Sequence, residues 1–202
     1  MNTAIAIITG DIINSRKETP KVWLPHLKEA LNTFGKEPEQ WEIYRGDSFQ
    51  LQVSPEQALE AAIYIKATLK QNKGIDVRMA IGIGEKDYES EKITESNGSA
   101  FVHSGDCFEK LKKQTLALKS DSKAFDTTMN IMLQLALLNM NTWLPATARV
   151  VKITMEHPES NQNELAAMLE NSQSNVSEAL IRAGFDEVQK MIQFYKTQIE
   201  QL

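Results

Sequence analysis

Two Gly-Asp pairs are the residues of this chain whose type and setting best suit chemistry. Gly10-Asp11 follows an apolar run, and Gly46-Asp47 lies between two stretches in which polar and apolar residues alternate. If these stretches are neighbouring strands, both carboxylates come within reach of one cation. Two carboxylates, a main-chain carbonyl and phosphate oxygens suit Mg²⁺, which prefers hard oxygen ligands and accepts few from the protein. We therefore expect Asp11 and Asp47 to bind Mg²⁺.

Groups that bind phosphate lie close to both pairs in the sequence. Backbone amides and cationic side chains are common phosphate ligands. The expected phosphate or nucleotide ligands are the amide of Ile12 and the side chains of Ser15, Arg16, Arg45 and Arg78. The alternative is structural: Gly-Asp is a common turn dipeptide, and the last two arginines would then pair with Asp47 and Asp76.

The elements that must position these residues alternate between strand and helix up to about residue 120. Period-two alternation and apolar runs predict strands at 3–9 (ending at Gly10-Asp11), at 41–53 as a hairpin turning at 45–47, at 75–84 and at 115–119. Helical spacing predicts helices at 21–35, 54–71 and 99–113. Small residues on one face of 75–84, Ala80 and Gly82, leave room for a helix or a ligand. The β-α-β-β-α-β order predicts an α+β class with a ferredoxin-like sheet.

Only helical periodicity remains after residue 120. Helices are expected at 125–140, 145–156, 162–169, 173–183 and 185–200. We therefore divide the chain into an α+β domain at 1–122 and a helical domain at 123–202. Apolar stripes on the first and last of these helices fit either a core or a dimer interface, and we expect a homodimer.

Residues 162–184 are the most specific stretch of the chain. Leu165, Ala166 and Leu169 would face inward from a short helix, and Val176 and Ala179 from a second one. The pattern resembles bacterial helix-turn-helix regulators, whose segments read like "ELA…L..SQS.VS.AL.RAG". That resemblance places six side chains in the major groove of DNA: Gln173, Ser174, Asn175, Ser177, Glu178 and Arg182.

The charge of the helical half argues against DNA binding by this half alone. Residues 125–202 contain five Lys/Arg and nine Asp/Glu, a net charge of −4. Contacts with phosphate supply most non-specific affinity for DNA, and few cations are available here. Dimerisation would double the contacts. The alternative is a helical module that binds another protein, or binds nothing.

The first half resembles the catalytic domain of class III nucleotidyl cyclases, which share a palm-type sheet with GGDEF domains. Asp11 and Gly46-Asp47 match the two metal-binding positions of those domains, and Arg78-Met-Ala-Ile-Gly-Ile-Gly84 is similar to a cyclase strand. More closely, Gly10-Asp-Ile-Ile-Asn-Ser-Arg16 with Arg45-Gly-Asp-Ser-Phe-Gln50 resembles the SatD family, small bacterial proteins often described as regulators. This resemblance covers residues 4–111.

Two departures from the cyclase pattern bear on activity. Ile43 stands where cyclases place a base-selecting lysine, and residues 98–111 lack an Asn followed four residues later by Arg. Only His103 and Lys110 stand in for those transition-state groups. Phosphoryl transfer depends mostly on positioning and charge stabilisation, so such a site would bind a nucleotide and turn it over slowly or not at all.

The composition of the chain excludes several classes of protein and of site. With 42% hydrophobic and 24% charged residues the chain is globular, and its net charge of −5 gives no overall attraction for nucleic acid or a membrane. A single cysteine excludes an internal disulfide and a multi-cysteine zinc site. We expect a cytoplasmic protein without a membrane partner or secretory signal.

Three functions remain open at this point. The leading hypothesis is a transcriptional regulator that binds DNA through the helix-turn-helix and senses a nucleotide or phosphorylated small molecule, with Mg²⁺, through the first domain. The second is a Mg²⁺-dependent nucleotidyl cyclase or nucleotidyltransferase. The third is a protein-interaction module in which both sites are degenerate.

Overall fold

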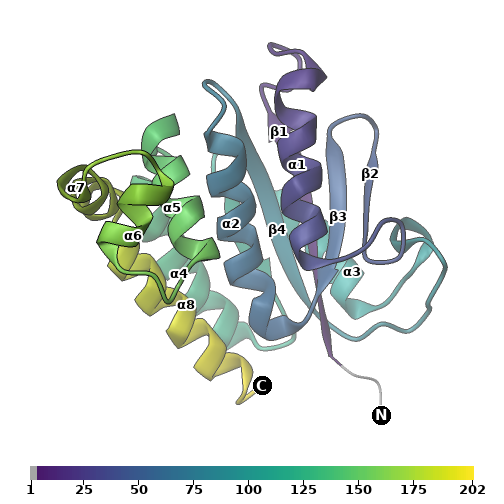
Figure 1. The fold of residues 1–202 in the computed structure, drawn as a ribbon. Helices are drawn as coiled ribbons and strands as arrows, with labels where there is room; N and C mark the ends of the chain where they lie inside the picture. Colours follow the sequence, from purple (N-terminus) through teal and green to yellow (C-terminus); the bar gives the residue numbers. More distant parts are fainter. Residues whose placement is uncertain (1–3) are drawn as a thin grey trace.

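The computed structural model describes residues 4–202, and these form an α+β structure in which helices cover both faces of one mixed sheet (Figure 1). The sheet has five strands in the order β2-β3-β1-β4-β5. The strands are β1 (Ile5–Ile13), β2 (Trp41–Tyr44), β3 (Ser48–Val53), β4 (Asp76–Gly84) and β5 (Leu116–Lys119). The helices are α1 (Pro20–Phe34), α2 (Ala58–Lys70), α3 (Ser99–Lys110), α4 (Lys123–Met140), α5 (Pro145–Glu156), α6 (Gln162–Met168), α7 (Gln173–Ala183) and α8 (Phe185–Ile199).

The central strand, β1, is longer than the sequence predicted. It pairs antiparallel with β3 on one side and β4 on the other, and Asp11 lies opposite Ser48 and Arg78. The prediction that Gly10-Asp11 ends this strand is wrong, because pairing on both sides satisfies the backbone groups of these residues. Gly10 has a packing role instead: a Cβ there would lie 2.5 Å from the ring of Phe49.

The β2–β3 hairpin turns at 45–47, as predicted. Arg45 has φ 52° and Gly46 has φ 90°, so two successive residues adopt positive φ. This backbone matches the right-handed twist of the paired strands, and glycine tolerates it best. The hairpin therefore brings Asp47 to the start of β3, beside the end of β1.

The two faces of the sheet are covered differently. The face towards α1 and α2 carries most of the apolar core, and α2 is buried along almost its whole length. The other face is covered by α3 (Figure 1). The small residues of β4 serve this helix rather than a ligand, since a Cβ on Gly82 would lie 2.2 Å from the carbonyl oxygen of Ala100. The segment 85–98 between β4 and α3 contains one short 3-10 turn, Ile93–Glu95.

The five helices that follow β5 begin and end within two residues of their predicted ranges. Their core is continuous with that of the sheet. Met129 and Leu133 of α4 and Tyr195 of α8 belong to the same apolar cluster as Leu59 of α2, so the stripe predicted as core or interface lies largely in the core. The hydroxyl of Tyr195 also donates to the carbonyl of Pro55 at 2.6 Å. The division of the chain after residue 122 stays a prediction.

Within residues 4–202, none of the helices combines the length and apolar character needed to span a bilayer.

Candidate functional site

The first group of predicted site residues gathers at one end of the sheet. Four segments meet there and are called the rim below: residues 14–21 after β1, 45–47 in the hairpin, 71–74 before β4, and 109–114 after α3. Figure 1 shows the first three of these at the top of the molecule. Asn14 Nδ2 donates to the carbonyl of Gly74 at 2.8 Å, which fastens two of them together.

Asp11 and Arg78 face each other across β1 and β4 as a two-pronged ion pair. Arg78 Nε lies 3.1 Å from Asp11 Oδ1, and Nη2 lies 2.6 Å from Oδ2. The guanidinium also donates to the carbonyl of Leu111 at 3.3 Å and lies over the ring of Phe108, 4.7 Å from its centroid. Both predicted ligands therefore already have partners. A cation at Asp11 would use the remaining lone pairs or displace the arginine.

Asp47 stands beside this pair and holds the end of β1. Its carboxylate accepts a hydrogen bond from Ser15 Oγ at 2.5 Å, and its carbonyl accepts one from the amide of Ile12 at 3.1 Å. The Ile12 amide is thus paired within the fold. Asp47 lies in the turn directly before Ser48, the β3 partner of Asp11, so the two predicted ligands belong to neighbouring segments at this end of the sheet.

The donor set fits Mg²⁺ in kind, since it offers carboxylate and carbonyl oxygens. Among residues 4–202, however, no three or more histidine, cysteine or acidic side chains converge in a metal-binding arrangement. A metal held by Asp11 and Asp47 would therefore need oxygen ligands from outside the protein. A phosphate group supplies such oxygens.

Arg16 and Arg45 are the predicted phosphate ligands that remain available. Both side chains are exposed, and neither forms an ion pair within the described residues. The predicted alternative of pairs between Arg45 and Asp47 and between Arg78 and Asp76 is wrong: Arg78 binds Asp11, while Asp76 binds two lysines. Of the two groups considered as transition-state substitutes, Lys110 lies in the rim, whereas His103 contacts the carbonyl of Ile83.

The sequence analysis missed Lys66, which is completely buried on α2. Its Nζ lies 2.8 Å from Asp76 Oδ1 and 3.3 Å from Thr115 Oγ1. Burial, opposed by the charge of Asp76, lowers the pKa of Lys66 to about 8. Lys70 also binds Asp76, at 3.1 Å, and donates to the carbonyl of Asn141 at 2.9 Å. These contacts connect the end of α2 with the end of α4. In the sequence, a lysine inside the apolar run of 58–70 is the feature that could have identified this buried residue.

Tyr44 is a second residue that sequence reasoning missed. It stands at the end of β2, opposite Ser48. Its pKa is raised above the ordinary value, mainly by burial and to a smaller extent by the negative charge of Asp11, while Arg45 acts in the opposite direction. Tyr44 is therefore close enough to sense the charge state of the carboxylate site.

The second candidate site is the α6–α7 pair. Asn161 caps α6 and forms a capping box with Glu164. The inward-facing residues form their own apolar cluster, which contains Leu165, Ala166, Leu169, Val176 and Ala179 with Val150 of α5. The second helix ends at Gly184, whose φ of 60° suits glycine.

The predicted DNA-contacting residues lie on the outer face of α7. Ser177 is half-buried, and the other five are exposed: Gln173, Ser174, Asn175, Glu178 and Arg182. Several are held by neighbours. Gln173 Nε2 donates to Gln162 Oε1 at 2.6 Å, and Arg182 Nη1 lies 3.2 Å from Glu178 Oε2. The outer face is thus polar and largely ordered by its own hydrogen bonds.

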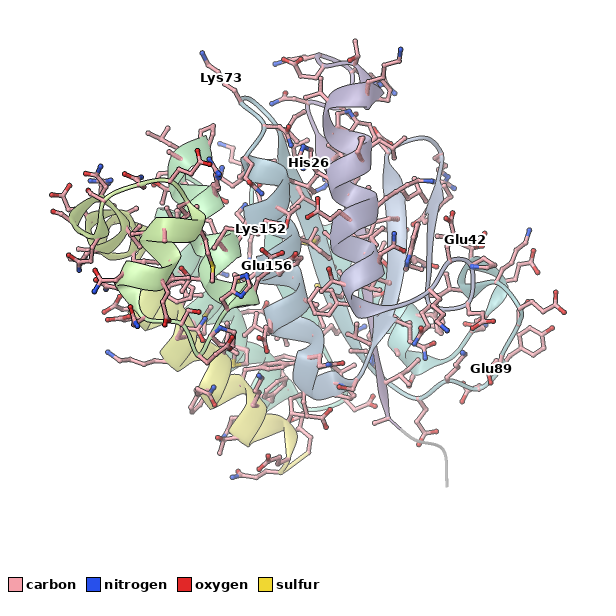
Figure 2. The ribbon with its side chains drawn as sticks, viewed as in Figure 1. His26, Glu42, Lys73, Glu89, Lys152 and Glu156 are labelled. Atoms are coloured by element: carbon pink, nitrogen blue, oxygen red, sulfur yellow. The ribbon has the colours of Figure 1, made fainter. Side chains whose placement is uncertain are left out.

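Lys152 connects α5, the helix against which α7 packs, with the helices α1 and α2 that cover the sheet. Figure 2 shows it beside Glu156 on α5. Its Nζ lies 2.7 Å from Glu156 and 2.9 Å from Glu29 of α1, and Tyr64 of α2 donates to Glu156 at 2.5 Å. Although burial lowers it, these hydrogen bonds with the two glutamates raise the pKa of Lys152. Three helices therefore meet at one charged cluster.

Comparisons with known proteins add no family assignment: no protein-family model matches this chain, and no curated protein sequence matches it significantly.

Proposed function

We propose that this protein is a transcriptional regulator that binds DNA through α6 and α7 as a helix-turn-helix. The observation that carries the proposal is the division of α7 into two faces. One face packs Val176 and Ala179 against α5 and α6, and the other presents exposed amide and hydroxyl side chains to solvent. Asparagine and glutamine side chains can read adenine by two hydrogen bonds, and arginine can read guanine or contact phosphate.

The rim would sense a nucleotide or phosphorylated small molecule, with Mg²⁺ held by Asp11 and Asp47. Support comes from the place of Asp47 directly before the β3 partner of Asp11, and from the exposed Arg16 and Arg45 in the rim. The sheet, ordered β2-β3-β1-β4-β5, is the framework on which we propose a ferredoxin-like, cyclase-like domain. When bound, Mg²⁺ would neutralise phosphate charge. The chain's own groups would orient the ligand. The resemblance to the SatD family points the same way.

The direct test is selection of a bound sequence from a random duplex library, followed by binding measurements by fluorescence anisotropy. Asn175→Ala and Arg182→Ala should each weaken specific binding by at least tenfold, because each removes an expected contact to a base or phosphate. Lys190→Ala, which removes an exposed cation from α8, is the matched control. Enrichment of no sequence, or equal binding by all variants, would contradict the proposal.

A second candidate function is that of a Mg²⁺-dependent nucleotidyl cyclase or nucleotidyltransferase. The place of Asp47 directly before the β3 partner of Asp11 favours it, and the pairing of Asp11 with Arg78 opposes it. Incubation with each nucleoside triphosphate and Mg²⁺ tests it by product analysis. Turnover that is lost in Asp47→Asn would establish the enzyme.

The third candidate, a protein-interaction module, draws support from the acidic charge of residues 125–202. It predicts that neither nucleotide nor DNA binds.

We also propose a cytoplasmic homodimer, which would present two α7 helices to DNA. The outer face of α4 supports it: Ile131, Leu135 and Leu138 are 54%, 64% and 75% exposed. They occupy one helical stripe beside an apolar groove of about 470 Å³ between α4 and α8. In the proposed twofold dimer, the apolar ridge of one protomer would meet the apolar groove of the other.

A further inference from the structure

The rim has a charge opposite to that of the whole molecule. Its four segments contain eight Lys/Arg and three Asp/Glu, a net charge of +5, whereas the chain carries −5. The eight cations are Arg16, Lys17, Lys21, Arg45, Lys73, Lys110, Lys112 and Lys113, and all are exposed. The remainder of the chain is therefore strongly acidic, and the charge of the molecule is polarised towards one end of the sheet.

These cations are not used in stabilising the fold. Within residues 4–202 none of the eight forms an ion pair, in contrast to the neighbouring Lys66, Lys70 and Arg78. Like charges gathered without partners oppose folding through mutual repulsion. Their arrangement on four separate segments therefore points to an external polyanion.

The rim is wider than the nucleotide proposed to bind near Asp11 and Asp47, so its outlying cations suit a polymer. The basic segments run from the β2–β3 hairpin to the connection before β5, which are the two edges of the five-stranded sheet. Strands lie about 4.8 Å apart, so four spacings extend over roughly 19 Å. Duplex DNA carries one charge for about every 1.7 Å of its axis and can contact such a surface along its full width.

The rim is also connected to α7 through a chain of contacts. Asn139 Nδ2 donates to the carbonyl of Arg182 at 3.0 Å, so the end of α4 holds the end of α7. Lys70 at the end of α2 donates to Asn141, which follows α4. The next loop carries Lys73, which projects away from the molecule (Figure 2). The C-terminal end of α7 and the loop that carries Lys73 are therefore linked through the end of α4 and the end of α2.

We propose that the rim supplies the contacts with the DNA phosphate backbone that the acidic α4–α8 segment lacks. The inference rests on the proposed function, because it assigns a second surface to the same DNA. In this arrangement α7 reads bases and the rim provides most of the electrostatic attraction.

The test is the salt dependence of binding to a short duplex of mixed sequence, which requires no knowledge of the operator. The triple variant Arg16→Ala/Arg45→Ala/Lys73→Ala removes three rim cations from three segments. Each lost phosphate contact lowers the slope of log K against log salt by about 0.9, so we expect a decrease of roughly 2 to 3 and a marked loss of affinity at low salt. All three side chains are exposed, and thermal unfolding confirms that the variant is folded.

The matched control is Lys28→Ala/Lys36→Ala/Lys190→Ala, which changes the net charge equally at exposed positions outside the rim. If the two triple variants gave equal slopes, the inference about the rim would be overturned. The proposed function would still stand in that case, provided that the wild-type protein binds DNA. If the rim variant lost ATP binding while its DNA affinity stayed unchanged, the rim would be assigned to the small ligand, and the inference would likewise be overturned. A wild-type protein that binds no DNA at low salt would overturn both.

Discussion

The pair between Asp11 and Arg78 decides whether the first site is structural or binds a ligand. Each group holds the other through two hydrogen bonds, and both side chains are partly exposed. A site with this geometry can be stable without a metal. If Asp11 binds a metal ion, as proposed, that ion competes with Arg78 for the same carboxylate.

Arg78→Gln is therefore expected to lower the free energy of unfolding by about 1–3 kcal/mol, because it leaves the carboxylate without its charged partner. Urea denaturation measures this change. The Asp11→Asn variant and the double variant complete a cycle, in which the double variant should lose less than the sum of the single losses. Strict additivity would show that the two side chains do not stabilise each other.

Lys66 predicts an unusual dependence of stability on pH. Its folded-state pKa of about 8 lies below its ordinary value of 10.5, because burial disfavours the charged form. Between these two values the unfolded chain binds a proton that the folded chain does not, so stability rises with pH across this window. Its contribution is unfavourable below pH 8. The Lys66→Met variant should lack this rise.

Chemical denaturation at intervals between pH 7.5 and 10 checks this prediction, since the window of Lys66 lies there. Lys70→Met is the comparison: it removes the second ammonium beside Asp76, whose charge also lowers the pKa of Lys66, so it should reduce the rise without abolishing it. A wild-type curve that is flat or falls over this range would contradict the assignment to Lys66.

At the scale of the elements, Gly10 shows why the end of β1 was not predicted correctly. Glycine followed by aspartate is typical of a turn, but here glycine admits the Phe49 ring from β3. Gly10→Ala should destabilise the protein by about 1–3 kcal/mol, because a Cβ would overlap that ring. Thermal unfolding measures the loss. In Gly10→Ala/Phe49→Leu the smaller side chain should restore part of the stability, whereas a turn requirement predicts no restoration.

Local patterns were sufficient for most of the elements. The helices from Lys123 onwards follow an apolar period and caps such as Asn161, both of which are readable along the chain. The end of β1 depends on β3 and β4, which lie far away in the sequence. The same applies to the site. The strand order was enough to predict that Asp11 and Asp47 lie at the same end of the sheet. The partner of each charge depends on strand register, which places Arg78 opposite Asp11 and leaves Asp76 to two lysines.

At the scale of the whole molecule, the exposed stripe on α4 predicts association. Leu135→Glu should convert a dimer into a monomer, because it places a charge in the centre of the proposed apolar contact. Sedimentation velocity measures the change. Gln134→Glu, one position away on the same helix and also exposed, is the matched control. A wild-type monomer at high concentration would contradict the dimer.

The shared core has a consequence for how the molecule melts. Tyr195 near the C-terminus holds Pro55, and Lys152 ties α5 to both α1 and α2. Helices that bury their apolar faces against the sheet cannot loosen alone without exposing it. The chain should therefore unfold in a single calorimetric transition, and proteolysis should release no stable α6–α7 fragment. A ligand that binds either the rim or the α6–α7 pair would then raise the melting temperature of the entire chain.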